Sequence, residues 1–93
     1  MVRVTVRFYA SLRDDVGVGE VVVRLNDSSF SSLINGLRML LGVKAGRIFS
    51  EDGSLRNGLM VSVNNAIIHL SNVQEFKLCE DDVVDFMPTP SGG

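Results

Sequence analysis

The sequence predicts a single α+β domain, in which a mixed sheet of about five strands packs on one main helix. Two patterns carry this prediction. Alternation of apolar and polar residues occurs toward both ends of the chain, whereas a three- and four-residue apolar spacing dominates one segment in the middle. The length of 93 residues suits one hydrophobic core, and 45% hydrophobic against 22% charged residues is typical of a globular protein.

The first two strands are predicted between residues 2 and 25. Apolar residues occupy every second position over residues 2–8, which is the period of a strand with one buried face. Residues 20–25 form a second β-branched run, preceded by Gly17 and Gly19. We expect these strands to form a hairpin, with residues 10–19 as its loop.

The main helix is predicted over residues 30–41, where apolar residues recur at three- and four-residue steps. Ser28 or Ser29 can cap its start, and Gly42 is suited to its end. Gly36 lies inside the helix, where glycine costs about 1 kcal/mol relative to alanine. This glycine predicts either a close packing contact or an imperfect helix.

The second half of the chain contains three further strands. Residues 43–58 are rich in glycine turns and predict an irregular connection, followed by strands at 59–63, 66–70 and 83–87. Asn64-Asn65 supplies the turn between the first two of them. The order strand, strand, helix, strand, strand, strand fits the β-grasp fold, because a ferredoxin-like sandwich would need a second long helix.

We expect the folded domain to comprise residues 1–87 and a flexible tail to comprise residues 88–93. Pro88 and Pro90 fix their own φ angles, and the chain closes on Gly92-Gly93. Six extended residues reach roughly 20 Å, at about 3.3 Å each. A glycine backbone also enters channels that exclude larger residues. Terminal glycines and prolines also occur in tails that only fray, so the ending alone leaves both interpretations open.

Composition excludes several classes of function. A net charge of −2 gives no electrostatic reason to expect a nucleic-acid or membrane partner. The single cysteine excludes an internal disulfide and a four-cysteine metal centre, and we expect neither a metal site nor a bound cofactor. No nucleophile paired with a base is apparent, so no catalytic residue is predicted. Without an apolar leader or a membrane-spanning run, the expected location is cytoplasmic.

Four sequence blocks resemble the ubiquitin-like sulfur carriers, the family of the molybdopterin synthase small subunit and its relatives. They are Val-Arg-Phe-Tyr-Ala-Ser-Leu-Arg-Asp-Asp-Val-Gly at 6–17, Met-Val-Ser-Val-Asn-Asn at 60–65, the approach to the last strand at 78–84, and the tail at 86–93. The chain departs from the family pattern at Asp81, Thr89 and Pro90. The tail is also similar to that of the ubiquitin-related and archaeal small modifiers.

The resemblance implies a carrier rather than an enzyme. A ubiquitin-activating-type enzyme would use ATP to convert the Gly93 carboxylate to an acyl-adenylate, and a sulfur donor would then leave a thiocarboxylate. Gly92 and Ser91 would keep the tail thin enough to enter that enzyme. The sulfur would be delivered inside the large subunit of molybdopterin synthase, for the molybdenum or tungsten cofactor.

Partner docking is expected near the base of the tail. The candidates are Met60, Phe86, Met87 and Pro88, since methionine adapts to irregular surfaces. Alternation places Phe86 and Met87 on opposite faces of the last strand, which makes Phe86 a candidate core residue as well.

Two other functions remain open at this point. In the first, the activated Gly93 forms an isopeptide bond with lysines of target proteins, as a ubiquitin-like modifier does; a relative of this kind can also carry sulfur, including for tRNA thiolation. In the second, the domain is an interaction module and its Gly-Gly ending has no role.

Overall fold

The computed structural model describes residues 2–68 and 76–89. The elements follow in the order β1 (Val2–Phe8), α1 (Ala10–Val16), β2 (Glu20–Leu25), α2 (Phe30–Leu41), the 3-10 helix η1 (Gly42–Arg47), β3 (Leu59–Val63), β4 (Ala66–Ile68) and β5 (Val83–Pro88). No helix in these two ranges is long and apolar enough to cross a membrane.

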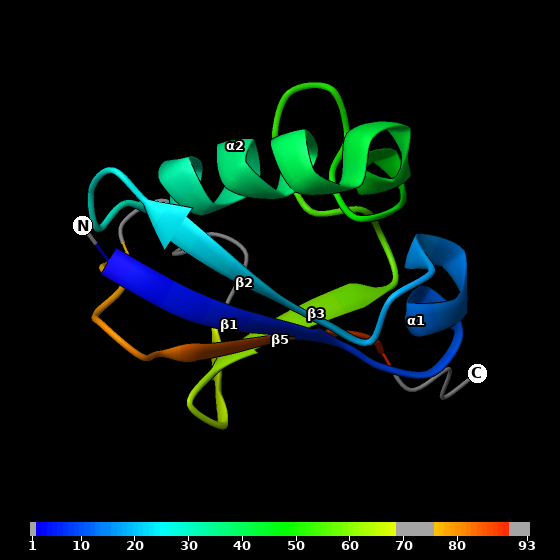
Figure 1. Cartoon of the computed structure of the whole chain (residues 1–93). Coiled ribbons are helices and arrows are strands. Elements are labelled where there is room, and N and C mark those ends of the chain that lie inside the picture. Colours follow the sequence, from blue (N-terminus) through cyan, green and yellow to red (C-terminus); the bar gives the residue numbers. More distant parts are fainter. Residues whose placement is uncertain (1, 69–75, 90–93) are drawn as a thin grey trace.

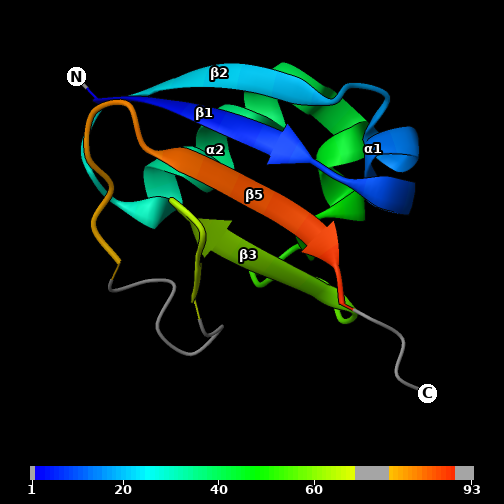
Figure 2. The ribbon, with the colours of Figure 1, turned by 90° about the horizontal axis from the view of Figure 1, so that it is seen from below.

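The strands form one mixed sheet in the order β2-β1-β5-β3-β4, and α2 lies across one of its faces (Figure 1). The two strands nearest the chain ends, β1 and β5, run parallel in the middle, and the other pairings are antiparallel. Figure 2 shows the opposite face, where β2, β1, β5 and β3 lie side by side in front of α2. This is the predicted β-grasp arrangement.

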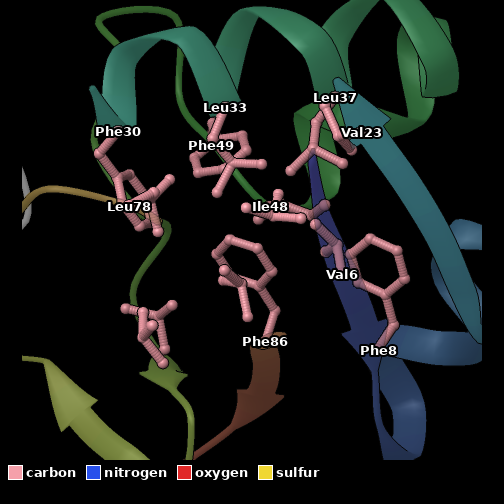
Figure 3. Close-up of a cluster of buried hydrophobic side chains, with 14 of the residues drawn as sticks. Val6, Phe8, Val23, Phe30, Leu33, Leu37, Ile48, Phe49, Leu78 and Phe86 are labelled. Carbon is pink, nitrogen blue, oxygen red and sulfur yellow. The ribbon is translucent and has the colours of Figure 1, made fainter. Parts of the chain in front are cut away.

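The core fills the space between the sheet and α2. The inward residues of the strands meet those of the helix and of the segment after it, as Figure 3 shows. Phe86 lies near the centre, with its ring centroid 6.1 Å from that of Phe8 and 5.6 Å from that of Phe49. Aromatic pairs at such distances add to the free energy gained from burial alone.

The main helix begins and ends as predicted. The Ser29 side chain caps its start by accepting a hydrogen bond from the Ser32 N–H, and Gly42 ends it with φ at +61°. Gly36 is explained by close packing, because a Cβ there would lie 2.6 Å from Cγ1 of Val23 on β2. The glycine therefore lets α2 approach the sheet.

One segment differs from the prediction. The expected loop at 10–19 contains the seven-residue helix α1, which ends at Gly17 with φ at +89°. Only Leu12 and Val16 of this helix are buried, so its apolar pattern amounts to a single four-residue step. The glycine-rich connection also contains a short element, η1.

The ends of β4 and β5 can be compared with the predicted strand boundaries. β4 covers Ala66–Ile68, and the other two residues of the predicted strand, 69 and 70, lie outside the described residues. β5 continues through Pro88, one residue beyond the predicted end of the domain at 87.

Candidate carrier site at the end of β5

The residues proposed for chemistry follow the last described residue, Thr89. Ser91, Gly92 and Gly93 lie outside the described residues. What the structure describes is the base from which they continue and the two surfaces on either side of it.

The base is anchored to the start of β3. Pro88 pairs in register with Leu59, and the Thr89 N–H donates a hydrogen bond of 2.7 Å to the Gly58 carbonyl oxygen. The Thr89 hydroxyl donates to the same oxygen at 3.2 Å. Since proline has no N–H to donate, the Thr89 bonds hold the strand end where the ladder would otherwise weaken. The departure point of the chain end is therefore fixed.

The docking candidates separate onto two faces. Phe86 is fully buried, which confirms its interpretation as a core residue and makes it unavailable as an exposed docking residue; alternation directs it toward α2. Met87 pairs with Met60 across the β5–β3 ladder on the opposite face, and both are half-buried. Pro88, also half-buried, adjoins them. A small apolar surface thus remains beside the strand end.

The same sheet face carries a polar network. The Tyr9 hydroxyl donates to Asp85 Oδ1 at 3.1 Å, and the Ser62 hydroxyl donates to Oδ2 at 3.4 Å. Asp85 is only 6% exposed, although it lies on the face away from the helix. Nearby, Arg7 Nε lies 3.2 Å from Glu20 Oε1. Hydrogen bonding to the Tyr9 hydroxyl, followed by that to Glu20, raises the pKa of Arg7 above its ordinary value.

Sequence reasoning missed this network. Its signal was present, because Asp85 interrupts an apolar run in what the pattern predicts to be a strand. A charged side chain at such a position needs hydrogen-bond partners, and these come from Tyr9, directly after β1, and from Ser62 on β3, both distant from Asp85 in sequence.

A groove of about 660 Å³ lies on the other side of the strand end. Its lining includes Pro88 and Leu59 together with Val43, Arg47 and Arg56, and we call it the η1 groove. Four separate segments of the chain form it, α1 among them through Ser11, Leu12 and Asp15. The sequence alone could not bring these segments together, because most of them belong to regions predicted only as loops.

The side chains that could ligate a metal ion are dispersed in the part of the chain that the structure describes. Residues 2–68 and 76–89 contain no group of three or more His, Cys, Asp and Glu side chains placed to hold an ion. Cys79 is an exposed free thiol, and His69 lies outside the described residues.

Comparison with known proteins supports the resemblance. A model of the ThiS family matches residues 6–93, nearly the whole chain. A search of curated proteins gives no match.

Several solved structures share the fold. SAMP1 from Haloferax volcanii is 22% identical with a TM-score of 0.78, covering 98% of this chain and 99% of that one. A chain of the BexX/CysO complex from Amycolatopsis orientalis is 24% identical with a TM-score of 0.71, covering 97% and 99%. A Pyrococcus furiosus protein provisionally assigned as molybdopterin converting factor subunit 1 is 22% identical with a TM-score of 0.68, covering 95% and 98%. At these identities the likeness establishes a common fold.

Proposed function

This chain belongs to the ThiS family, and on that premise we propose that it is a sulfur carrier activated at the Gly93 carboxylate by a partner enzyme. The observation that carries the proposal is the family match, which extends through residue 93. The rigid base at Thr89 supports it, because only four residues separate this anchor from the reacting carboxylate. Four extended residues span at most roughly 13 Å.

The chemistry requires activation because a carboxylate is a poor electrophile. In the proposed sequence a Gly93 oxygen attacks the α-phosphorus of ATP in the partner's active site, and pyrophosphate leaves. A persulfide of the donor then attacks the acyl carbon and AMP leaves, which gives an acyl disulfide. A second thiol then attacks the donor's sulfur in that disulfide. The S–S bond to the acyl sulfur breaks, the thiocarboxylate remains on Gly93, and the second thiol and the donor sulfur are oxidised together to a new disulfide. This chain acts as the substrate in each step.

Docking is proposed to use the sheet side of the strand end. Met60 and Met87 form an adaptable apolar surface beside Pro88, at the point where a partner must approach to receive residues 90–93. The proposed acceptor of the sulfur is a pterin precursor held by the large subunit of molybdopterin synthase. The sequence block at 6–17 favours this acceptor, whereas the tail at 86–93 resembles both the carriers and the small modifiers.

A second candidate function uses the same activation. Structural neighbours include a small archaeal modifier protein from Haloferax volcanii, which motivates conjugation of Gly93 to lysines of target proteins. The two functions differ only in the nucleophile that attacks the acyl carbon, sulfur or amine.

Intact-protein mass spectrometry tests the proposal directly. The untagged chain is incubated with the activating enzyme of the same organism, ATP and a sulfur donor. We expect a mass gain equal to one sulfur-for-oxygen exchange, absent when Gly93 is deleted and absent when a residue is added after it. Lysine adducts through Gly93 without the exchange would move the modifier function to first place. Neither product, with an enzyme of proven competence, would refute both.

A further inference from the structure

Large apolar side chains are exposed in the η1 groove and in the preceding part of the chain. Val43, which lines the groove, is 96% exposed; Met39 and Leu40, at the end of α2 and outside the lining, are 87% and 57% exposed. Soluble monomers seldom leave large apolar side chains grouped and bare unless a partner covers them. Val43 also lines an adjoining hollow of about 690 Å³, so the exposed apolar surface continues past the groove itself.

Two of the arginines in this region, Arg38 and Arg56, are bound to backbone oxygens rather than to acids. Arg56 Nε donates to the Gly46 carbonyl oxygen at 2.7 Å, and Arg38 donates to that of Ser50 at 2.9 Å. Within residues 2–68 and 76–89 the three ion pairs all involve Arg3 or Arg7, on the sheet. The positive charge of Arg47 and Arg56 is therefore available to a partner.

Two carboxylates, Asp15 in the groove and Glu51 in the hollow, offset this charge only in part. Three arginines line the two depressions, Arg38, Arg47 and Arg56, so the lining as a whole is positive. The complementary surface is one that carries acidic side chains.

The position of the groove indicates which protein supplies that surface. Pro88 lines the groove and is also the last residue of β5. An enzyme that encloses residues 90–93 therefore contacts this side of the strand as well as the side of Met60 and Met87. We infer that a segment of the activating enzyme with acidic and aliphatic side chains binds the η1 groove, covers Val43 and pairs with Arg47 and Arg56. The inference rests on the proposed function, whose partner it specifies.

Other occupants fit less well. In a second copy of this chain the acidic turn at 80–82 is already engaged: Glu80 and Asp81 contact Arg3, and Asp82 accepts bonds from Cys79 N and Asn64. An anionic membrane or nucleic acid would meet a chain with a net charge of −2 and a groove with only a few cations.

The test measures binding of the full chain to the purified activating enzyme by calorimetry, with Arg47→Glu and Val43→Glu as variants. We expect each to raise Kd by at least about tenfold, since a like charge or a buried carboxylate then faces an acidic surface. Binding of the wild-type chain should weaken as salt is raised, and Arg47→Glu should lose most of that dependence. Because both side chains are exposed, thermal unfolding should be unchanged.

Arg24→Glu is the matched control, because it makes the same charge change at an exposed side chain outside the η1 groove. Arg24 lies on β2 and pairs in register with Arg3 on β1. This variant should bind as the wild-type chain does. Equal Kd values for all four proteins would overturn the inference, and so would Val43-dependent sedimentation with phosphatidylserine vesicles. If the wild-type chain gains sulfur while Arg47→Glu and Val43→Glu bind the enzyme normally, the groove inference fails and the carrier function stands. If the wild-type chain binds the enzyme but gains no sulfur, the carrier function fails instead.

Discussion

The two surfaces on either side of Pro88 differ in whether their charged side chains contact other side chains of the domain. On the sheet side, Arg7 pairs with Glu20, and Asp85 is held by Tyr9 and Ser62. On the helix side, Arg56 in the η1 groove and Arg38 in the adjoining hollow donate to backbone carbonyls, and none of Arg38, Arg47 and Arg56 has a carboxylate partner among the described residues. The same distinction applies to apolar groups, since Met60 and Met87 are half-buried whereas Val43 is nearly bare.

This difference separates residues that hold the domain together from residues left for a partner. A buried charge satisfied within the fold, such as that of Asp85, contributes to stability, because its removal leaves a buried group without a hydrogen-bond partner. Exposed groups without internal partners contribute little to folding, so their substitution should change binding instead. Stability and binding measurements on matched variants therefore test the comparison.

The largest effect is expected beneath the sheet surface, at Phe86. Phe86→Ala should lower the free energy of unfolding by about 3–5 kcal/mol, because it leaves a cavity between Phe8 and Phe49. Met87→Ala, one residue later on the opposite face, should cost about 1 kcal/mol or less. Urea unfolding monitored by circular dichroism measures both. Similar losses for the two variants would mean that the strand does not divide core from surface here.

The second effect compares two carboxylates, one from each surface. Asp85→Ala should destabilise the domain by about 1–3 kcal/mol, because the buried Ser62 hydroxyl loses its acceptor. Asp15→Ala, in the η1 groove, should change stability by no more than about 0.5 kcal/mol. If the two substitutions have equal effects in urea unfolding, the sheet network is not structural and the comparison fails.

The elements with strong periodicity were predictable from the sequence, and the site was predictable only in part. β1, β2, α2, β3 and β5 each repeat their apolar spacing often enough to be identified. α1 contributes only Leu12 and Val16 to the core, which is too short a pattern to distinguish from a loop. Alternation correctly put Phe86 and Met87 on opposite faces and made Phe86 the candidate core residue, although Phe86 was also kept among the docking candidates.

The η1 groove was beyond sequence reasoning for a different reason. Val43, Arg47, Arg56 and Pro88 come from segments up to 45 residues apart, and no local rule brings them to one surface. The Gly93 carboxylate, in contrast, could be identified from the sequence. Gly93 lies outside the described residues, so activation of its carboxylate stays a prediction.

A smaller effect should distinguish paired from unpaired charges on the surface. Glu20→Gln removes the ion pair with Arg7. Both side chains of this pair are exposed, Arg7 to 47% and Glu20 to 56%. We expect a slight loss of stability at low salt that disappears at high salt, because exposed pairs are screened. Arg47→Gln should show no loss at either salt concentration. A salt-dependent loss in Arg47→Gln would reveal an internal partner that the comparison denies.

The smallest effect concerns the pKa of Asp27, a carboxylate before α2 that also has hydrogen-bond donors within the domain. Asp27 Oδ1 accepts from the Ser29 N–H at 2.8 Å and the Ser32 hydroxyl at 2.7 Å, and such bonds, chiefly those from Ser29, lower the pKa of Asp27 from 3.8 to about 2. Since the folded pKa lies below the unfolded one, the stabilisation is fully present above pH 3.8 and is lost as pH falls through about 2.

NMR titration of the Asp27 carboxyl carbon measures this value directly. Ser32→Ala removes one donor and should move the midpoint part of the way back toward 3.8, while the remaining Ser29 bonds keep it below that value. A wild-type midpoint already at 3.8 would mean that these short hydrogen bonds are not kept in solution. Asp85 and the Arg7–Glu20 pair would then remain as the charges satisfied within the fold.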